Sequence, residues 1–154
     1  MIGNVSPALN ALKDYASRMK QPSPDSFTAL IVDDEDPVRR FVERVMREAG
    51  YKTATAADGP DAIEAAAHLG AFDILVTDLM MPKMNGDELA RRLRIQEPSL
   101  KVLYLTGFSD KLFKEKSTLW ADEAFLEKPC TVKGLLQAVS LLLVGRFELP
   151  AHLA

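Results

Sequence analysis

Four short apolar runs of this chain end in side chains that can bind a cation or a phosphoryl group. They are TALIV (28–32) before Asp33 and Asp34, DILVT (73–77) before Asp78, KVLYL (101–105) before Thr106, and AFLE (124–127), whose last residue precedes Lys128. Carboxylate oxygens suit a hard cation such as Mg²⁺, and a lone lysine suits a phosphoryl group. Together these residue types predict a site that accepts a phosphoryl group on an aspartate.

The four runs bring these side chains together only if they are parallel strands of one sheet. The C-terminal ends of such strands share an edge, and ligands bind at that edge in open α/β sheets. Strand-like and helix-like segments alternate from residue 27, which predicts a parallel sheet with helices on both faces and right-handed crossovers. The expected strands are 28–32, 51–56, 73–77, 101–105 and 124–126, and the expected helices run from Asp36 to Gly50, 61–69, 87–95, 109–118 and 131–144.

Asp33 and Asp34 are explained better by a metal ion than by helix capping. An acidic residue after a strand often caps the next helix, but Asp36, beside Pro37, is better placed for that task. Two adjacent carboxylates repel each other unless a cation is bound. We therefore expect Mg²⁺ at this position, held by Asp34 and by Asp78.

Asp78 is the candidate phosphoacceptor, because it ends the most apolar strand-like run and aspartyl phosphates are known covalent intermediates. Positioning and electrostatics carry most of phosphoryl transfer, so Lys128 is expected to add positive charge. Pro129 ends its strand and favours a geometry that aims Lys128 inward. The Thr106 hydroxyl can donate to a phosphoryl oxygen, although a threonine at a strand end is equally explained by β-propensity.

Composition predicts a single globular domain that binds neither nucleic acid nor membrane. The chain has 154 residues, 47% hydrophobic, with a net charge of −3 and a pI near 5.4. A nucleic-acid-binding surface is normally basic. The longest apolar stretch, LQAVSLLLV (136–144), is well short of the roughly 20 residues of a membrane helix. With one cysteine and no signal-peptide pattern, we expect a cytoplasmic protein.

The chain divides into three parts. Residues 1–26 predict an amphipathic helix followed by a proline-rich linker, QPSPDS (21–26). This helix either packs or frays on its own domain, or it contacts a second copy or another partner. Residues 27–145 form the main domain, and residues 146–154 form a tail too short for an output domain.

Four motifs of the main domain resemble those of the receiver domain of two-component response regulators. They are LIVDDED (30–36), VTDLMMPKMNG (76–86), LYLTG (103–107) and FLEKP (125–129). The resemblance covers residues 27–145. It implies a flavodoxin-like, doubly wound, five-stranded parallel sheet in the order 2-1-3-4-5, to which the N-terminal helix is an addition.

The resemblance also implies a role for each site residue. Asp78 is the expected phosphoacceptor and Lys128 the phosphate-contacting lysine, in a Lys-Pro bond that is often cis in such domains. The expected ligands of Mg²⁺ are Asp34, Asp78 and the backbone carbonyl of Met80, with Asp33 acting through water. Thr106 and Phe125 resemble the paired switch residues of the family.

By the same resemblance, the chain is a phosphoacceptor signalling module rather than an enzyme. A histidine kinase or a phosphotransfer protein would phosphorylate it, and the change would repack a protein-binding face made by 109–118, 124–126 and 131–144. That face, or the N-terminal helix, is where we expect a downstream target or a homodimer contact. The alternatives are a phosphate sink or relay, a small-substrate phosphotransferase or phosphohydrolase, and an unphosphorylated scaffold.

Two apolar residues flank the expected path of water to the phosphoryl group. Met80 lies two residues after Asp78, and Phe108 lies two residues after Thr106. Neither side chain can orient an attacking water. We therefore expect slow self-dephosphorylation.

Overall fold

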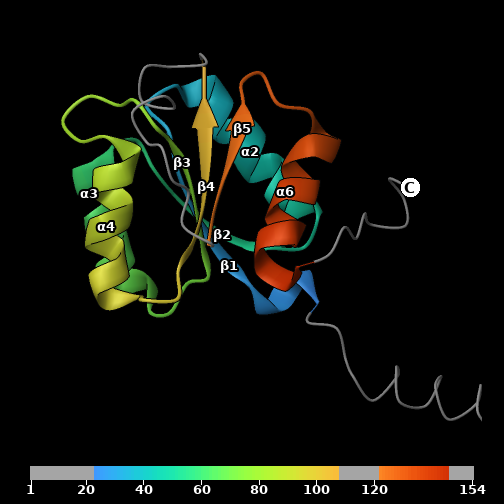
Figure 1. Cartoon of the computed structure of the whole chain (residues 1–154), viewed down its shortest axis with the longest axis horizontal. Coiled ribbons are helices and arrows are strands. Elements are labelled where there is room, and N and C mark those ends of the chain that lie inside the picture. Colours follow the sequence, from blue (N-terminus) through green and yellow to red (C-terminus); the bar gives the residue numbers. More distant parts are fainter. Residues whose placement is uncertain (1–22, 108–121, 146–154) are drawn as a thin grey trace, which may run out of the picture.

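A five-stranded parallel sheet lies between two layers of helices in the computed structural model of the chain, which describes residues 23–107 and 122–145 (Figure 1). Apolar strands joined by helical crossovers favour this arrangement. The elements in chain order are η1 (Pro24–Ser26), β1 (Thr28–Val32), α2 (Asp36–Glu48), β2 (Lys52–Ala56), α3 (Gly59–Leu69), β3 (Ile74–Asp78), α4 (Gly86–Gln96), β4 (Lys101–Thr106), β5 (Glu123–Glu127) and α6 (Val132–Val144).

The strand order is β2-β1-β3-β4-β5, and every neighbouring pair is parallel. This confirms the flavodoxin-like topology expected from the sequence. Every residue of β3, the central strand, is buried, whereas most residues of β2, at one edge of the sheet, are partly or fully exposed. A run such as ILVTD, apolar at nearly every position, is typical of a strand covered on both faces. The register therefore brings the C-terminal ends of β1, β3, β4 and β5 to one edge.

The two faces of the sheet bury separate sets of side chains because successive residues of a strand point in opposite directions. Leu30 and Val32 of β1 belong to the core under α3 and α4, and Ala29 and Ile31 belong to the core under α2 and α6. Figure 1 shows α3 and α4 on one side of the sheet and α2 and α6 on the other. Helices on both faces hold the strands, and thus the edge, in a fixed frame.

Side chains cap the N-termini of α3 and α6, but not those of α2 and α4. Asp58 caps α3 by accepting the Asp61 amide at 2.8 Å, and Thr131 caps α6 by accepting the Gly134 amide at 2.9 Å. The prediction that Asp36 caps the second helix is wrong. Asp36 is already the first helical residue, and Glu35 occupies the cap position with no side-chain hydrogen bond to the helix.

Several predicted segments lie outside the described residues. These are the N-terminal helix before residue 23, Phe108, the helix at 109–118, and the tail from residue 146. Of the predicted linker, Pro24–Ser26 forms the 3₁₀ turn η1. Within 23–107 and 122–145, no helix combines the length and apolar character that crossing a bilayer requires.

Replacing Leu103 by alanine should lower the free energy of unfolding by about 2–5 kcal/mol, because a cavity is left in the core under α2 and α6. The Leu103 side chain is fully buried in β4. Ile95→Ala is the matched control, since Ile95 is 83% exposed at the end of α4. Urea unfolding of both variants checks this. A loss for Leu103→Ala as small as that of the control would contradict the packing described.

Candidate functional site

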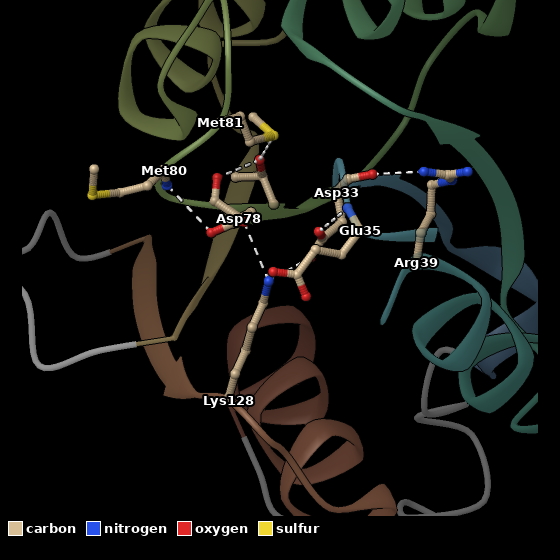
Figure 2. Close-up of polar contacts among 8 residues, drawn as sticks. Asp33, Glu35, Arg39, Asp78, Met80, Met81 and Lys128 are labelled. Atoms are coloured by element: carbon tan, nitrogen blue, oxygen red, sulfur yellow. Dashed lines mark hydrogen bonds and ion pairs between the residues drawn. The ribbon is translucent and has the colours of Figure 1, made fainter. Parts of the chain in front are cut away.

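The carboxyl edge of the sheet gathers side chains that are far apart in the sequence. Lys128, which directly follows β5, places its Nζ 2.8 Å from Oδ2 of Asp33 and 3.2 Å from Oδ2 of Asp78. Figure 2 shows the lysine extending from the end of β5 toward these two carboxylates. Three of the predicted site residues thus form one bridged group.

Asp34 completes a cluster of three carboxylates. Asp33, Asp34 and Asp78 each offer an oxygen, and these oxygens lie within 4.8 Å of one another. Asp33 and Asp78 are buried, whereas Asp34 faces solvent. One ammonium cannot balance three carboxylates, so a net negative charge remains. An all-oxygen donor set of this size and charge, open on one side, fits Mg²⁺, which keeps several of its waters.

The pKa values within this cluster reflect burial and crowding. Burial raises the pKa of Asp78, and the charge of Asp33 raises it further, against the lowering effect of the Lys128 charge. Burial alone would lower the pKa of Lys128, but its contacts with Asp33 and Asp78 outweigh that effect and raise it. The lysine is therefore firmly protonated, and ionised Asp78 is under electrostatic stress that a cation would relieve.

The loop between β1 and α2 is held by a residue that the sequence did not single out. Arg39 donates from Nη1 to the backbone carbonyl of Asp33 at 2.7 Å and also pairs with Asp36. Asp33 in turn accepts the Glu35 amide on Oδ1 at 2.9 Å. Asp33 therefore has a structural task that the sequence did not predict, since it orders its own loop. An arginine three residues after Asp36 is the available signal, but this spacing is common on exposed helices.

The loop between β3 and α4 fixes Asp78 through its backbone. The Met80 amide donates to Oδ1 of Asp78 at 3.2 Å, and the Gly86 amide donates to the Leu79 carbonyl at 2.8 Å. A Cβ added at Gly86 would lie only 2.2 Å from the Asp78 carbonyl oxygen, so the loop closes against the strand too tightly for any side chain. The Met80 side chain is 55% exposed and points away from the carboxylates (Figure 2).

Thr106 and Lys128 are linked through the backbone at the same edge. Thr106 is buried at the end of β4, and its carbonyl accepts the Lys128 amide at 2.7 Å. The peptide bond between Lys128 and Pro129 is cis, as expected from the sequence. The ends of β4 and β5 are thus joined beside the cluster.

Phe125 packs on a tyrosine that sequence reasoning overlooked. Its ring stacks on that of Tyr104, with centroids 5.1 Å apart and an interplanar angle of 26°. The Tyr104 hydroxyl lies 3.3 Å from Oε1 of Glu123, which also pairs with Arg94 at 2.6 Å. The aromatic residue within the aliphatic run KVLYL was the available signal. Any repacking of Phe125 must therefore disturb its stack on the buried Tyr104 ring.

Comparison with known proteins identifies the family. The profile of the response regulator receiver domain matches residues 29–140, which is most of the chain. The chain belongs to the receiver-domain family. Aspartyl phosphorylation and Mg²⁺ binding are general features of receiver domains within two-component systems.

Individual relatives agree with this assignment. The receiver protein CpdR of Brucella abortus (strain 2308) is 32% identical over 116 residues, covering 75% of this chain and 96% of CpdR. The sensor kinase CckA of the same strain is 37% identical over 119 residues, covering 77% of this chain but only 13% of CckA. The crystal structure of CheY4 of Vibrio cholerae superposes with a TM-score of 0.68 at 31% identity, covering 76% of this receiver chain and 98% of CheY4.

Replacing Asp78 by asparagine should stabilise the protein at pH 7 in Mg²⁺-free buffer. Because the native pKa of Asp78 is raised, the native state binds more protons than the unfolded chain between the two pKa values. Wild-type stability therefore falls as pH rises from about 3.9, the unfolded value, through the native pKa. The variant lacks this loss, so its urea midpoint should exceed that of wild type at pH 7 and converge with it near pH 3.

Glu64→Gln is the control, since Glu64 is exposed on α3 and its replacement should change the midpoint little. A midpoint of Asp78→Asn below that of wild type at pH 7 would mean that the Lys128–Asp78 contact outweighs burial and repulsion.

Proposed function

We propose that this receiver domain is a phosphorylation-controlled signalling module in which Asp78 accepts a phosphoryl group in a Mg²⁺-dependent reaction. The observation that carries the proposal is the bridged cluster, in which Lys128 contacts Asp33 and Asp78 beside Asp34. The donor is a histidine kinase or a phosphotransfer protein, and the output is a contact with another protein. The proposed receiver unit spans residues 27–145 and acts in the cytoplasm.

Each side chain has a distinct role in this proposal. Asp34, Asp78 and the Met80 carbonyl hold the metal directly, and Asp33 holds it through water. Bound Mg²⁺ would neutralise charge on the transferring phosphoryl oxygens. Lys128 supplies a second positive charge from the end of another strand, β5, where its side chain is largely buried and its ammonium already faces Asp78.

The transfer step uses the Asp78 carboxylate as the nucleophile. One of its oxygens attacks phosphorus while the bond from phosphorus to the donor imidazole nitrogen breaks, and the imidazole leaves with the bonding electrons. The product is an acyl phosphate on Asp78. The Met80 amide, 3.2 Å from Oδ1, restrains the rotation of the carboxylate. Little covalent chemistry is needed beyond this positioning.

Phosphorylation then shifts the balance between two packings of the β4–β5 side. In the proposed switch, the Thr106 hydroxyl turns toward a phosphoryl oxygen and Phe125 occupies the space that it leaves. The stack on Tyr104 gives Phe125 a defined starting position. The added charge of about −2 at pH 7 supplies the driving force.

Incubation with acetyl phosphate and Mg²⁺ should add about 80 Da to the intact mass, and Asp78→Asn should gain nothing. Chelating Mg²⁺ should abolish the addition. Intact-mass spectrometry of both proteins is the measurement. Rapid consumption of acetyl phosphate without a mass change favours a phosphohydrolase, and the absence of both reaction and Mg²⁺ binding favours a scaffold. Either result would overturn the proposed function.

Replacing Met80 by asparagine should shorten the lifetime of the phosphoryl group. The Met80 side chain is apolar and exposed two residues after Asp78, so an amide at this position can orient an attacking water. One positioned polar group is commonly worth about ten-fold or more in rate. The half-life of phosphorylated protein is followed by mass after removal of the donor. Met80→Leu should keep the wild-type half-life, and an Asn variant as long-lived as wild type would count against the idea.

A further inference from the structure

The loop that carries Met80 contains a strained turn at Lys83. Lys83 has a φ of 69°, and it is the only residue other than glycine with positive φ in the described ranges. The Met84 amide donates to the Pro82 carbonyl at 2.8 Å, which closes a γ-turn around Lys83. A γ-turn with positive φ is rare and unfavourable for a residue with a side chain. Contacts outside the turn must therefore hold it.

An ion pair with the start of α3 provides such a contact. Lys83 Nζ lies 3.0 Å from Oδ2 of Asp58, while Oδ1 of Asp58 accepts the Asp61 amide. Asp58 is thus fixed by its capping bond and offers its second oxygen to the lysine. The amide of Asp61 and the contact with Lys83 both lower the pKa of Asp58, and the same contact raises the pKa of Lys83.

The loop between β3 and α4 also approaches α3 next to this ion pair. Met84 is buried, and a Cβ added at Gly59 would lie 2.7 Å from the Met84 Cβ. The backbone at Gly59 therefore packs closely against the loop. Asp58 and Gly59, adjacent in the sequence, thus meet Lys83 and Met84, which are also adjacent.

We infer that Asp58 and Lys83 are positioning residues for the metal and phosphoryl site, acting by fixing the loop that orients Met80. Only Met81 and Pro82 separate Met80 from Lys83, and Met81 is buried. A displacement of Lys83 would therefore also displace the Met80 amide, which donates to Asp78, and the Met80 carbonyl. Because that carbonyl is a metal ligand only in the proposed function, the inference rests on that proposal.

An exposed ion pair of this kind contributes little to overall stability. Groups that orient metal ligands nevertheless change metal affinity when they are removed. The expected signature is therefore weaker Mg²⁺ binding with nearly unchanged thermal unfolding, which a merely structural role would not produce.

Two single variants separate positioning from simple electrostatics. Lys83→Met removes a positive charge, which by charge alone would strengthen Mg²⁺ binding. Asp58→Asn removes a negative charge, which by charge alone would weaken it, and asparagine still caps the helix. If the pair positions the loop, both variants should instead weaken Mg²⁺ binding by about five-fold. The double variant should be no weaker than either single one, because both remove the same contact.

The measurement is a Mg²⁺ titration of the full chain, monitored by calorimetry and by the ¹H–¹⁵N resonance of Met80. The Met80 resonance should shift in both variants even before metal is added. Arg92→Met is the matched control, because Arg92 forms a similar exposed pair with Glu88 at 2.9 Å on α4. This control should bind Mg²⁺ as wild type does.

Opposite effects of the two variants, or affinities equal to that of wild type, would overturn the inference. Failure of the proposed function is distinguishable, because wild type itself would then neither bind Mg²⁺ nor accept a phosphoryl group.

Discussion

Repulsion among three carboxylates at one edge of the sheet is the constraint on which the site depends. Among residues 23–107 and 122–145, the ammonium of Lys128 contacts two of them, which leaves negative charge in excess within this group. Such an arrangement persists only if the backbone holds the carboxylates in place, and a cation or a phosphoryl group bound with a cation then relieves the stress. The two acidic loops accordingly have their own restraints. Arg39 holds the loop after β1, and the close approach of Gly86 to Asp78 holds the loop after β3.

The parallel sheet holds these like charges in place despite their repulsion. The strands that lead to the acids, β1 and β3, are buried and covered by helices on both faces, so their ends are anchored in both cores. Functional side chains on loops above a rigid scaffold are a general solution to precise placement. The sheet also separates the carboxylates from the other site residues. The carboxylates lie at the ends of β1 and β3, whereas Thr106, Phe125 and Lys128 lie on β4 and β5 or directly after them.

The β4–β5 side connects the site to a buried polar and aromatic network. Phe125 stacks on Tyr104, whose hydroxyl approaches the Glu123 carboxylate that pairs with Arg94. Burial raises the pKa of Tyr104 far above its ordinary value, with the Glu123 charge adding to the effect, so the hydroxyl stays protonated as a donor. A side chain that moves on phosphorylation would move against this network, which gives the two packings distinct energies.

The architecture, and the meeting of the predicted site residues at one edge of the sheet, could be predicted from the sequence. Strand-length apolar runs and helix-length amphipathic segments predict the parallel sheet, and side chains at the run ends meet because parallel strands share an edge. Contacts between separate elements were visible only in the tertiary structure. The hydrogen bond from Arg39 to the Asp33 carbonyl and the ion pair of Lys83 with Asp58 carry no periodic signal, because their partners are 6 and 25 residues apart and not three or four. The cap of α2 was likewise visible only in the tertiary structure. Asp33 accepts the Glu35 amide, and the helix starts without the expected side-chain cap. A local sequence pattern indicates which side chains of a segment are buried, whereas the conformation of a loop depends on the residues of other elements that contact it.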